Sequence, residues 1–132
     1  MKRIFTVFCL SVATFASALA QDAHVILISI DGLRPEFYKD ASWNMVNLRQ
    51  AMKTGAYSDG VKGVFPTVTY PSHTTMITGV QPLKHGVYYN NPSEPLGVTG
   101  KWFWDYSNIK VPTLFSVAKE KGLKTASVFW PV

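Results

Sequence analysis

The chain has 132 residues, enough for one modest domain, and a formal net charge of +5 at pH 7. Two positive charges, Lys2 and Arg3, lie in a leading segment with the pattern of an export signal, and removing it lowers the net charge to +3. Such a mildly basic surface does not indicate binding to a nucleic-acid polymer. The single cysteine, Cys9, lies in the same segment, so the rest of the chain has neither a disulfide nor thiol chemistry.

The leading segment Met1–Ala20 has the pattern of a secretory signal peptide. Its charged start precedes an apolar core from Ile4 to Leu10, and Ser17–Ala20 ends on the small-x-small pattern that signal peptidase cleaves. A membrane-spanning helix is the weaker alternative, because a span needs about 20 predominantly apolar residues and this run is shorter. We therefore expect cleavage after Ala20, a secreted or bacterial periplasmic location, and no membrane span in residues 21–132.

Strand and helix patterns alternate after this segment. His24–Ile30 is a continuous apolar run, as in a central parallel strand that is covered on both faces. Asp31 follows directly, where open α/β sheets place ligand groups, although an Asp-Gly pair also suits a turn or a helix cap. Apolar residues at helical spacing, stopped by Gly55, then predict a helix that packs on the core: Trp43, Met45, Val46, Leu48 and Met52.

The stretch Phe65–Asn90 carries the densest set of polar side chains. A short strand, Val61–Phe65, leads into a helix that ends at Gly79. The opening of this helix holds four hydroxyls and a histidine: Thr69, Ser72, His73, Thr74 and Thr75. A hydroxyl there either caps free N–H groups or attacks an anionic phosphoryl or sulfuryl group that the helix N-terminus holds.

An aromatic cluster follows a loop that is rich in Pro, Asn and Gly, residues 90–100. Within Lys101–Tyr106, Trp102 and Trp104 either line a pocket by stacking on a base or sugar, or pack in the core.

The last predicted helix has Pro112 near its first position and Gly122 just past its end. Its expected buried stripe is Leu114, Val117 and Ala118. Strands alternating with helices imply a parallel α/β sheet. Because a third strand, Thr125–Trp130, has no helix after it to cover the sheet, the chain has the pattern of the front of a larger domain.

Three segments together resemble the type I phosphodiesterase/nucleotide pyrophosphatase family of the alkaline phosphatase superfamily: Val25–Tyr38, Phe65–Asn90 and Val111–Pro131. The resemblance implies an alkaline phosphatase-like α/β sandwich, in which helices flank a central, largely parallel sheet, truncated here after about three core strands. Residues 21–132 would form the incomplete N-terminal portion of such a phosphodiesterase domain.

The resemblance implies roles for four residues and two Zn²⁺ ions. Asp31 would be a zinc ligand, and Thr69 would be both a zinc ligand and the nucleophile. Asn90 would donate a hydrogen bond to a phosphoryl oxygen, and the backbone N–H of Tyr70 would share that role.

Composition alone does not separate Thr69 from Thr67 or Ser72, so that assignment rests on the resemblance. The helix entry disfavours the sibling sulfatases, which carry Cys or Ser followed by x-Pro-x-Arg at this place. His73 and His85 are interpreted as structural, and His24 as either structural or simply exposed.

The implied reaction is zinc-dependent hydrolysis of a small phosphodiester or pyrophosphate, of nucleotide type, through a covalent phospho-threonine. Phosphomonoester hydrolysis is an alternative, and the oligomeric state stays open. The two-zinc site needs further aspartates and histidines expected beyond Val132, and the other carboxylates match none of those ligands: Asp59, Glu94, Asp105 and Glu120. This chain alone is therefore expected to be inactive, and a non-catalytic fragment or exported binding module using Trp102–Tyr106 is the competing hypothesis.

Overall fold

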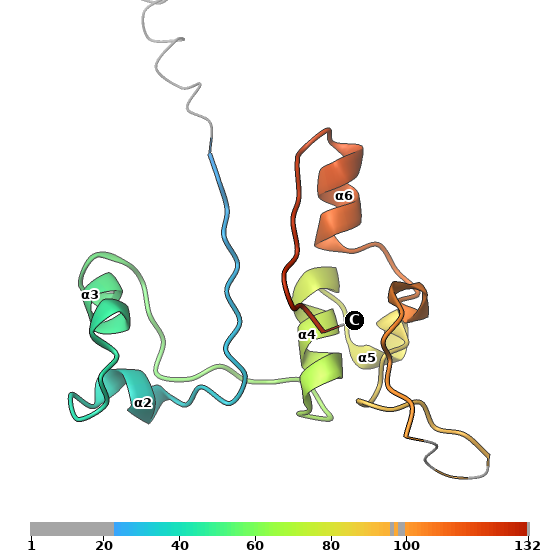
Figure 1. The fold of residues 1–132 in the computed structure, drawn as a ribbon, viewed down its shortest axis with the longest axis horizontal. Coiled ribbons are helices and arrows are strands. Elements are labelled where there is room, and N and C mark those ends of the chain that lie inside the picture. Colours follow the sequence, from blue (N-terminus) through green and yellow to red (C-terminus); the bar gives the residue numbers. More distant parts are fainter. Residues whose placement is uncertain (1–22, 96, 98–99, 132) are drawn as a thin grey trace, which may run out of the picture. The chain divides into compact units, whose positions relative to one another are not determined.

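A computed structural model describes residues 23–95, 97 and 100–131. The chain divides into two compact units, Met1–Ile30 and Asp31–Val132, which are described separately. In the first unit the described residues, 23–30, form neither helix nor strand and are all exposed (Figure 1). The predicted signal peptide lies outside the described residues.

The second unit is helical in the part of the chain that the structure describes (Figure 1). Its elements, in chain order, are α2 (Pro35–Lys39), α3 (Val46–Thr54), α4 (Thr69–Thr78), α5 (Pro82–His85), the 3-10 helix η1 (Tyr106–Asn108) and α6 (Leu114–Glu120). None of these described helices is long and apolar enough to cross a membrane.

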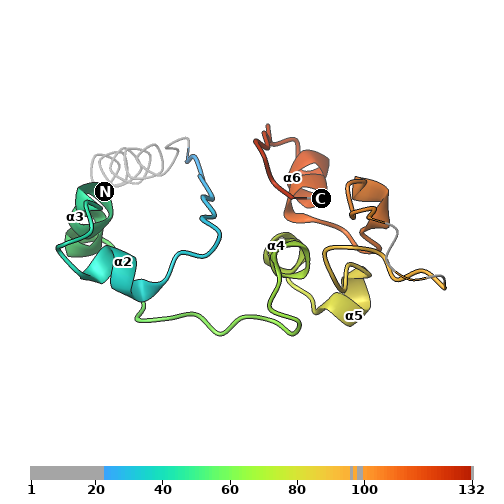
Figure 2. The same ribbon diagram turned by 60° about the horizontal axis from the view of Figure 1, so that its bottom comes forward.

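Helix α4 is the centre of the packed part of this unit. It contacts both α5 and α6, which lie beside it in both ribbon views (Figures 1 and 2). A small core forms where Tyr70, Val87 and Phe103 are buried against one another, with Ile109 packed on them. Tyr70 belongs to the first turn of α4, so this core fixes the end of the helix that carries the polar side chains.

Two helix ends follow the sequence prediction closely. Gly79 ends α4 in the left-handed conformation, with φ of 69°, as expected of a glycine at this place. At the end of α6 the N–H of Gly122 donates to Lys119 and that of Leu123 donates to Ala118, which is a Schellman motif around the predicted Gly122.

The start of α6 differs from the prediction. Its N-cap is Thr113, whose hydroxyl accepts from the N–H of Ser116 while the Ser116 hydroxyl accepts from the N–H of Thr113. Pro112 therefore precedes the cap instead of occupying the first turn. The reciprocal hydrogen bonds between Thr113 and Ser116 thus mark the start of α6.

The predicted buried stripes are not buried in the structure. Leu114 and Val117 of α6 are 54% and 42% exposed, and neither α3 nor α6 contains a buried residue. The helix predicted from Met45, Leu48 and Met52 does form and does end at Gly55, but its apolar face has little of the described chain against it. Helical periodicity thus located α3, while its burial depends on partners.

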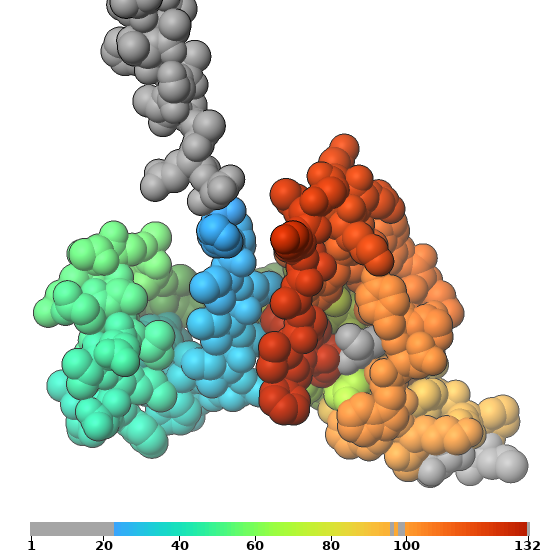
Figure 3. Space-filling model, turned by 45° about the horizontal axis from the view of Figure 1, so that its top comes forward, coloured from blue at the N-terminus to red at the C-terminus, as the bar shows by residue number. Residues whose placement is uncertain are grey.

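None of the three predicted strands is paired in the described part of the chain. The apolar side chains of these segments are open to solvent: Val25 is 91% exposed, Val61 91% and Val128 78%. The last segment lies on the surface of the view in Figure 3. Strands gain both backbone hydrogen bonds and burial from neighbouring strands, so the α/β sandwich remains a prediction.

Candidate active site at the start of helix α4

Thr69 is the first residue of α4, and its hydroxyl does not cap the helix. The N-cap is Val68, and no side chain caps this end. The Thr69 hydroxyl instead donates to Oδ2 of Asp31, 38 residues earlier in the chain, at 3.0 Å. Asp31 lies in a turn with Gly32, whose φ of 68° suits glycine. A contact over this sequence separation is a tertiary feature, unlike a local cap.

The two oxygens have the spacing of ligands that share one ion. Two ligands of a tetrahedral zinc, with bonds of about 2.0 Å, lie roughly 3.3 Å apart. The Asp31 and Thr69 oxygens are 3.0 Å apart, Asp31 is exposed and Thr69 is half-buried, so an ion can reach both. They fit as two of four ligands. Within the described residues no group of three or more His, Cys, Asp and Glu side chains gathers to complete a metal site.

The other carboxylates of interest have local structural roles. Asp59 pairs with Lys39 at 2.7 Å, and Glu94 lies 3.8 Å from Lys101. Asp105 accepts from the N–H of Ser107 at the start of η1, and this hydrogen bond lowers the pKa of Asp105. These contacts leave Asp31 as the carboxylate that meets the nucleophile candidate.

Asn90 lies beside the first turn of α4. Its Oδ1 accepts from the backbone N–H of Tyr70 at 3.0 Å. Among the described residues the Asn90 Nδ2 group has no partner, which leaves a donor for an anionic oxygen. The N–H of Tyr70, predicted to donate to the phosphoryl group, is already engaged by Asn90 in this conformation. A ligand would receive both donors only if the Asn90 carboxamide turned.

Backbone carbonyls of the first turn are held by side chains one turn later. The Thr69 carbonyl accepts from Nδ1 of His73 at 2.8 Å, and the Tyr70 carbonyl accepts from the Thr74 hydroxyl at 2.8 Å. His73 is buried, and its ring meets the edge of Trp130 at a centroid distance of 5.2 Å. The structure therefore gives His73 a supporting contact to Thr69, in line with its structural interpretation.

The aromatic cluster packs directly on Tyr70. Its ring lies 5.5 Å from that of Trp102 and 6.1 Å from that of Trp104. Tyr70 is 5% exposed and burial raises the pKa of its phenol, whereas Trp104 is 72% exposed. Within the cluster Phe103 is buried in the core, whereas Trp104 is exposed and its ring also lies 5.9 Å from that of Trp102, so pocket and packing both stay open for Trp104.

The sequence did not indicate how this cluster reaches α4. The Asn90 carbonyl accepts from the N–H of Phe103 at 3.2 Å, and Nδ2 of Asn91 donates to the Lys101 carbonyl at 2.6 Å. These bonds close the loop of residues 91–102 at its base. The adjacent residues Asn90 and Asn91 were the sequence signal for this loop closure, because side-chain amides commonly bond to nearby backbone.

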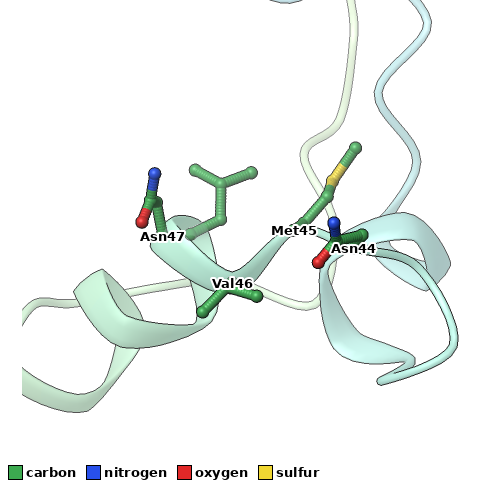
Figure 4. A pocket seen from close by; sticks show the side chains of 5 residues that line it. Asn44, Met45, Val46 and Asn47 are labelled. Atoms are coloured by element: carbon green, nitrogen blue, oxygen red, sulfur yellow. The ribbon is translucent and has the colours of Figure 1, made fainter.

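A surface depression elsewhere in this unit is lined by five consecutive residues at the start of α3, Asn44–Leu48 (Figure 4). It contains none of the residues described above. Because it is formed by one local stretch, it brings together no distant side chains.

Comparison with known proteins identifies the family. The family model for type I phosphodiesterase / nucleotide pyrophosphatase matches residues 25–132. The chain belongs to this family. The matched range includes Asp31, Thr69 and Asn90.

Several curated phosphodiesterase family members are similar to this chain. Ectonucleotide pyrophosphatase/phosphodiesterase family member 3 of Rattus norvegicus is 30% identical over 123 residues, covering 81% of the chain and 13% of the relative. Family member 1 of Homo sapiens is 29% identical, covering 80% and 12%. Venom phosphodiesterase 2 of Crotalus adamanteus is 28% identical, covering 90% and 15%. The chain therefore spans about one seventh of the length of these relatives.

Proposed function

We propose that this chain contributes the nucleophile and part of the metal site to zinc-dependent hydrolysis of phosphodiester or pyrophosphate bonds. The observation that carries the proposal is the 3.0 Å contact between the Thr69 hydroxyl and Asp31 at the start of α4. Family membership supports phosphodiester chemistry, as do the names of the similar proteins. Under this proposal residues 21–132 form part of an exported alkaline phosphatase-like domain that holds two zinc ions.

Thr69 and Asp31 perform linked steps in the proposed reaction. The Thr69 oxygen attacks phosphorus, the bond to the leaving group breaks, and water later hydrolyses the phospho-threonine to restore the hydroxyl. A neutral hydroxyl is a weak nucleophile, and Asp31 Oδ2 accepts its proton in a hydrogen bond. Zinc held by Asp31 and Thr69 would supply Lewis-acid stabilisation of the deprotonated oxygen. Nδ2 of Asn90 donates to a phosphoryl oxygen as negative charge builds there.

The proposed substrates are small phosphodiesters of nucleotide type. The exposed ring of Trp104 beside Tyr70 favours a leaving or retained group with a flat face, such as a base. Simple phosphomonoesters lack such a group and remain the alternative substrate class. A binding module that holds a ligand without hydrolysing it is the alternative function.

The test is hydrolysis of a p-nitrophenyl phosphodiester with and without zinc, by the 132-residue chain and by the protein encoded in its full reading frame. Thr69→Ala removes the nucleophile, and Thr67→Ala is the matched control, because Thr67 is exposed and two residues away. We expect zinc-dependent hydrolysis by the protein encoded in the full reading frame, abolished by Thr69→Ala and retained by Thr67→Ala. Activity that survives Thr69→Ala would overturn the proposal, and nucleotide binding without hydrolysis would favour the binding module.

A further inference from the structure

His85 is a fully buried polar side chain that the proposed reaction does not use. It ends the four-residue helix α5 and is 0% exposed. Its Nδ1 lies 3.2 Å from the backbone nitrogen of Val87, and its Nε2 lies 3.0 Å from the Thr75 hydroxyl on α4. The ring therefore joins Val87, two residues later, to Thr75, ten residues earlier on α4.

The Val87 contact fixes the tautomer of His85. A backbone N–H only donates, so Nδ1 must be unprotonated to accept it. Nε2 then carries the hydrogen and donates to the Thr75 hydroxyl, with the backbone of Pro71 as a second acceptor for the same hydrogen. Only the neutral ring satisfies both partners, because a protonated ring would set a second N–H against Val87. Burial lowers the pKa of His85, which favours this neutral form, and a backbone hydrogen bond with Pro71 opposes that shift.

The same bridge lies next to the segment that carries Asn90. After His85 the chain turns at Gly86, whose φ is 86° and where an added Cβ would lie 2.9 Å from Cγ of Lys110. The His85 carbonyl accepts from the N–H of Lys110 at 3.0 Å, which holds the turn from the other side. Val87 then enters the core against Tyr70. Asn90 comes three residues after Val87. The segment that carries the Asn90 carboxamide is therefore attached to α4 first at His85.

We infer that His85 is a positioning residue: its bridge from Thr75 to Val87 holds the Gly86 turn against α4 and thereby places the Asn90 carboxamide at the N–H of Tyr70. The inference rests on the proposed function for its catalytic meaning, since Asn90 is the phosphoryl-oxygen donor there. Its structural content stands on the contacts of His85 alone. A purely space-filling role would need neither the tautomer nor the two polar partners.

The first test reads the position of Asn90 without any catalysis. Hydrogen exchange of the Tyr70 amide in the 132-residue chain reports its bond to Asn90, and long-range proton–nitrogen NMR reports the His85 tautomer. Thr75→Val removes the hydroxyl at almost unchanged volume. Thr78→Val is the matched control on the same helix, because the Thr78 hydroxyl donates to the Thr74 carbonyl and accepts from the N–H of Val80 at 3.5 Å, both near the end of α4 that is far from Tyr70.

We expect Thr75→Val to raise the exchange rate of the Tyr70 amide by about tenfold, the scale of one lost hydrogen bond, and Thr78→Val to leave it unchanged. The Ile77 amide of α4 serves as the internal reference, because a general loosening of the helix would speed both amides together. An unchanged Tyr70 rate in Thr75→Val, or an equal rise at Ile77, overturns the inference. So does a His85 ring that carries its hydrogen on Nδ1.

A pair of His85 variants separates the two arms of the bridge. His85→Asn places an oxygen near the position of Nδ1 and keeps an acceptor for Val87, while it cuts the link to Thr75. His85→Gln reaches toward Thr75 and gives up the acceptor near Val87. In the protein encoded in the full reading frame we expect both variants to lower kcat at least threefold while KM changes less. If no form of the protein hydrolyses substrate, the proposed function fails, and the exchange result still decides the role of His85.

Discussion

The regions around α3 and α4 hold their helices by different means. Neither α2 nor α3 has a buried residue, and their surroundings are joined by exposed contacts such as the bond from the Tyr38 hydroxyl to the Ser58 carbonyl. Helix α4 has five buried residues, and its hydroxyls and histidine bond to backbone and to neighbouring segments. The polar helix is thus the more firmly packed one. Polar side chains can be held by single hydrogen bonds to nearby groups, whereas an apolar helix face is buried only when a large surface of other chain segments covers it.

Asp31 reaches the candidate site from the segment before α2, while Thr69, Tyr70 and Asn90 lie at or beside the start of α4, and replacing Asp31 gives the largest expected effect. Asp31→Asn keeps the size and an acceptor for Thr69 but removes the charge that attracts zinc. Under the proposed function we expect the activity of the protein encoded in the full reading frame to fall at least about 100-fold at fixed zinc, because loss of a proposed ligand exceeds the usual effect of a supporting residue. Unfolding by urea should be unchanged, because Asp31 is exposed. Asp59→Asn is the control, and equal losses in both variants would contradict the assignment.

The difference in packing is tested by one truncation in each region. Phe103 is 6% exposed in the core against Tyr70, and Leu48 of α3 is 37% exposed. We expect Phe103→Ala to lower the free energy of unfolding by about 3 kcal/mol and Leu48→Ala by about 0.5 kcal/mol. Urea titration followed by tryptophan fluorescence measures both. Similar losses would show that α3 is packed as firmly as α4.

A smaller effect comes from pH, through His85 near α4. Burial lowers the pKa of His85 in the folded chain, so below its ordinary value of about 6.5 the unfolded chain binds more protons. Stability from this residue is therefore complete above that value and is lost as pH falls through the lowered folded pKa. Urea midpoints from pH 7.5 to 5.0 should fall in the wild type and fall less in His85→Asn. The difference between the two proteins isolates His85, because His24 and His73 are present in both.

The smallest effect belongs to the ion pair between Lys39 of α2 and Asp59. Both side chains are exposed, at 45% and 78%, although their 2.7 Å contact raises the pKa of Lys39. Exposed pairs contribute little because water and salt screen them. We expect Lys39→Ala to leave the urea midpoint unchanged at low and high salt. A clear loss at low salt would mean that this contact fixes α2.

Local signals predicted much of the helical structure. Gly55, Gly79 and Gly122 each mark the end of a helix in the structure, as the sequence indicated. The short helices α2 and α5 were not predicted as helices, because a proline followed by three or four residues has the same pattern as a turn.

A long-range contact is seen in the structure only where both of its partners lie in the described chain. Resemblance to a family identified Asp31 and Thr69 from the sequence. Their contact, across 38 residues of sequence, is seen only in the folded structure. The engagement of the Tyr70 N–H by Asn90 was not predictable, since side-chain rotamers depend on packing. A sheet depends on hydrogen bonds between segments, and the apolar runs such as His24–Ile30 do not form strands in the described part of the chain.

The closed base of the loop at residues 91–102 has a consequence for how substrate preference changes. The N–H of Phe103 donates to the Asn90 carbonyl, so the two ends of the intervening chain are held together by a backbone hydrogen bond. Lengthening such an intervening chain costs little, about 0.6 kcal/mol for each doubling. Under the proposed function, insertions between these two residues would change the chain next to Trp102 without breaking the bond between Asn90 and Phe103. Substrate preference could then change in evolution through the intervening chain, while the proposed phosphoryl-oxygen donor, Asn90, stays where it is.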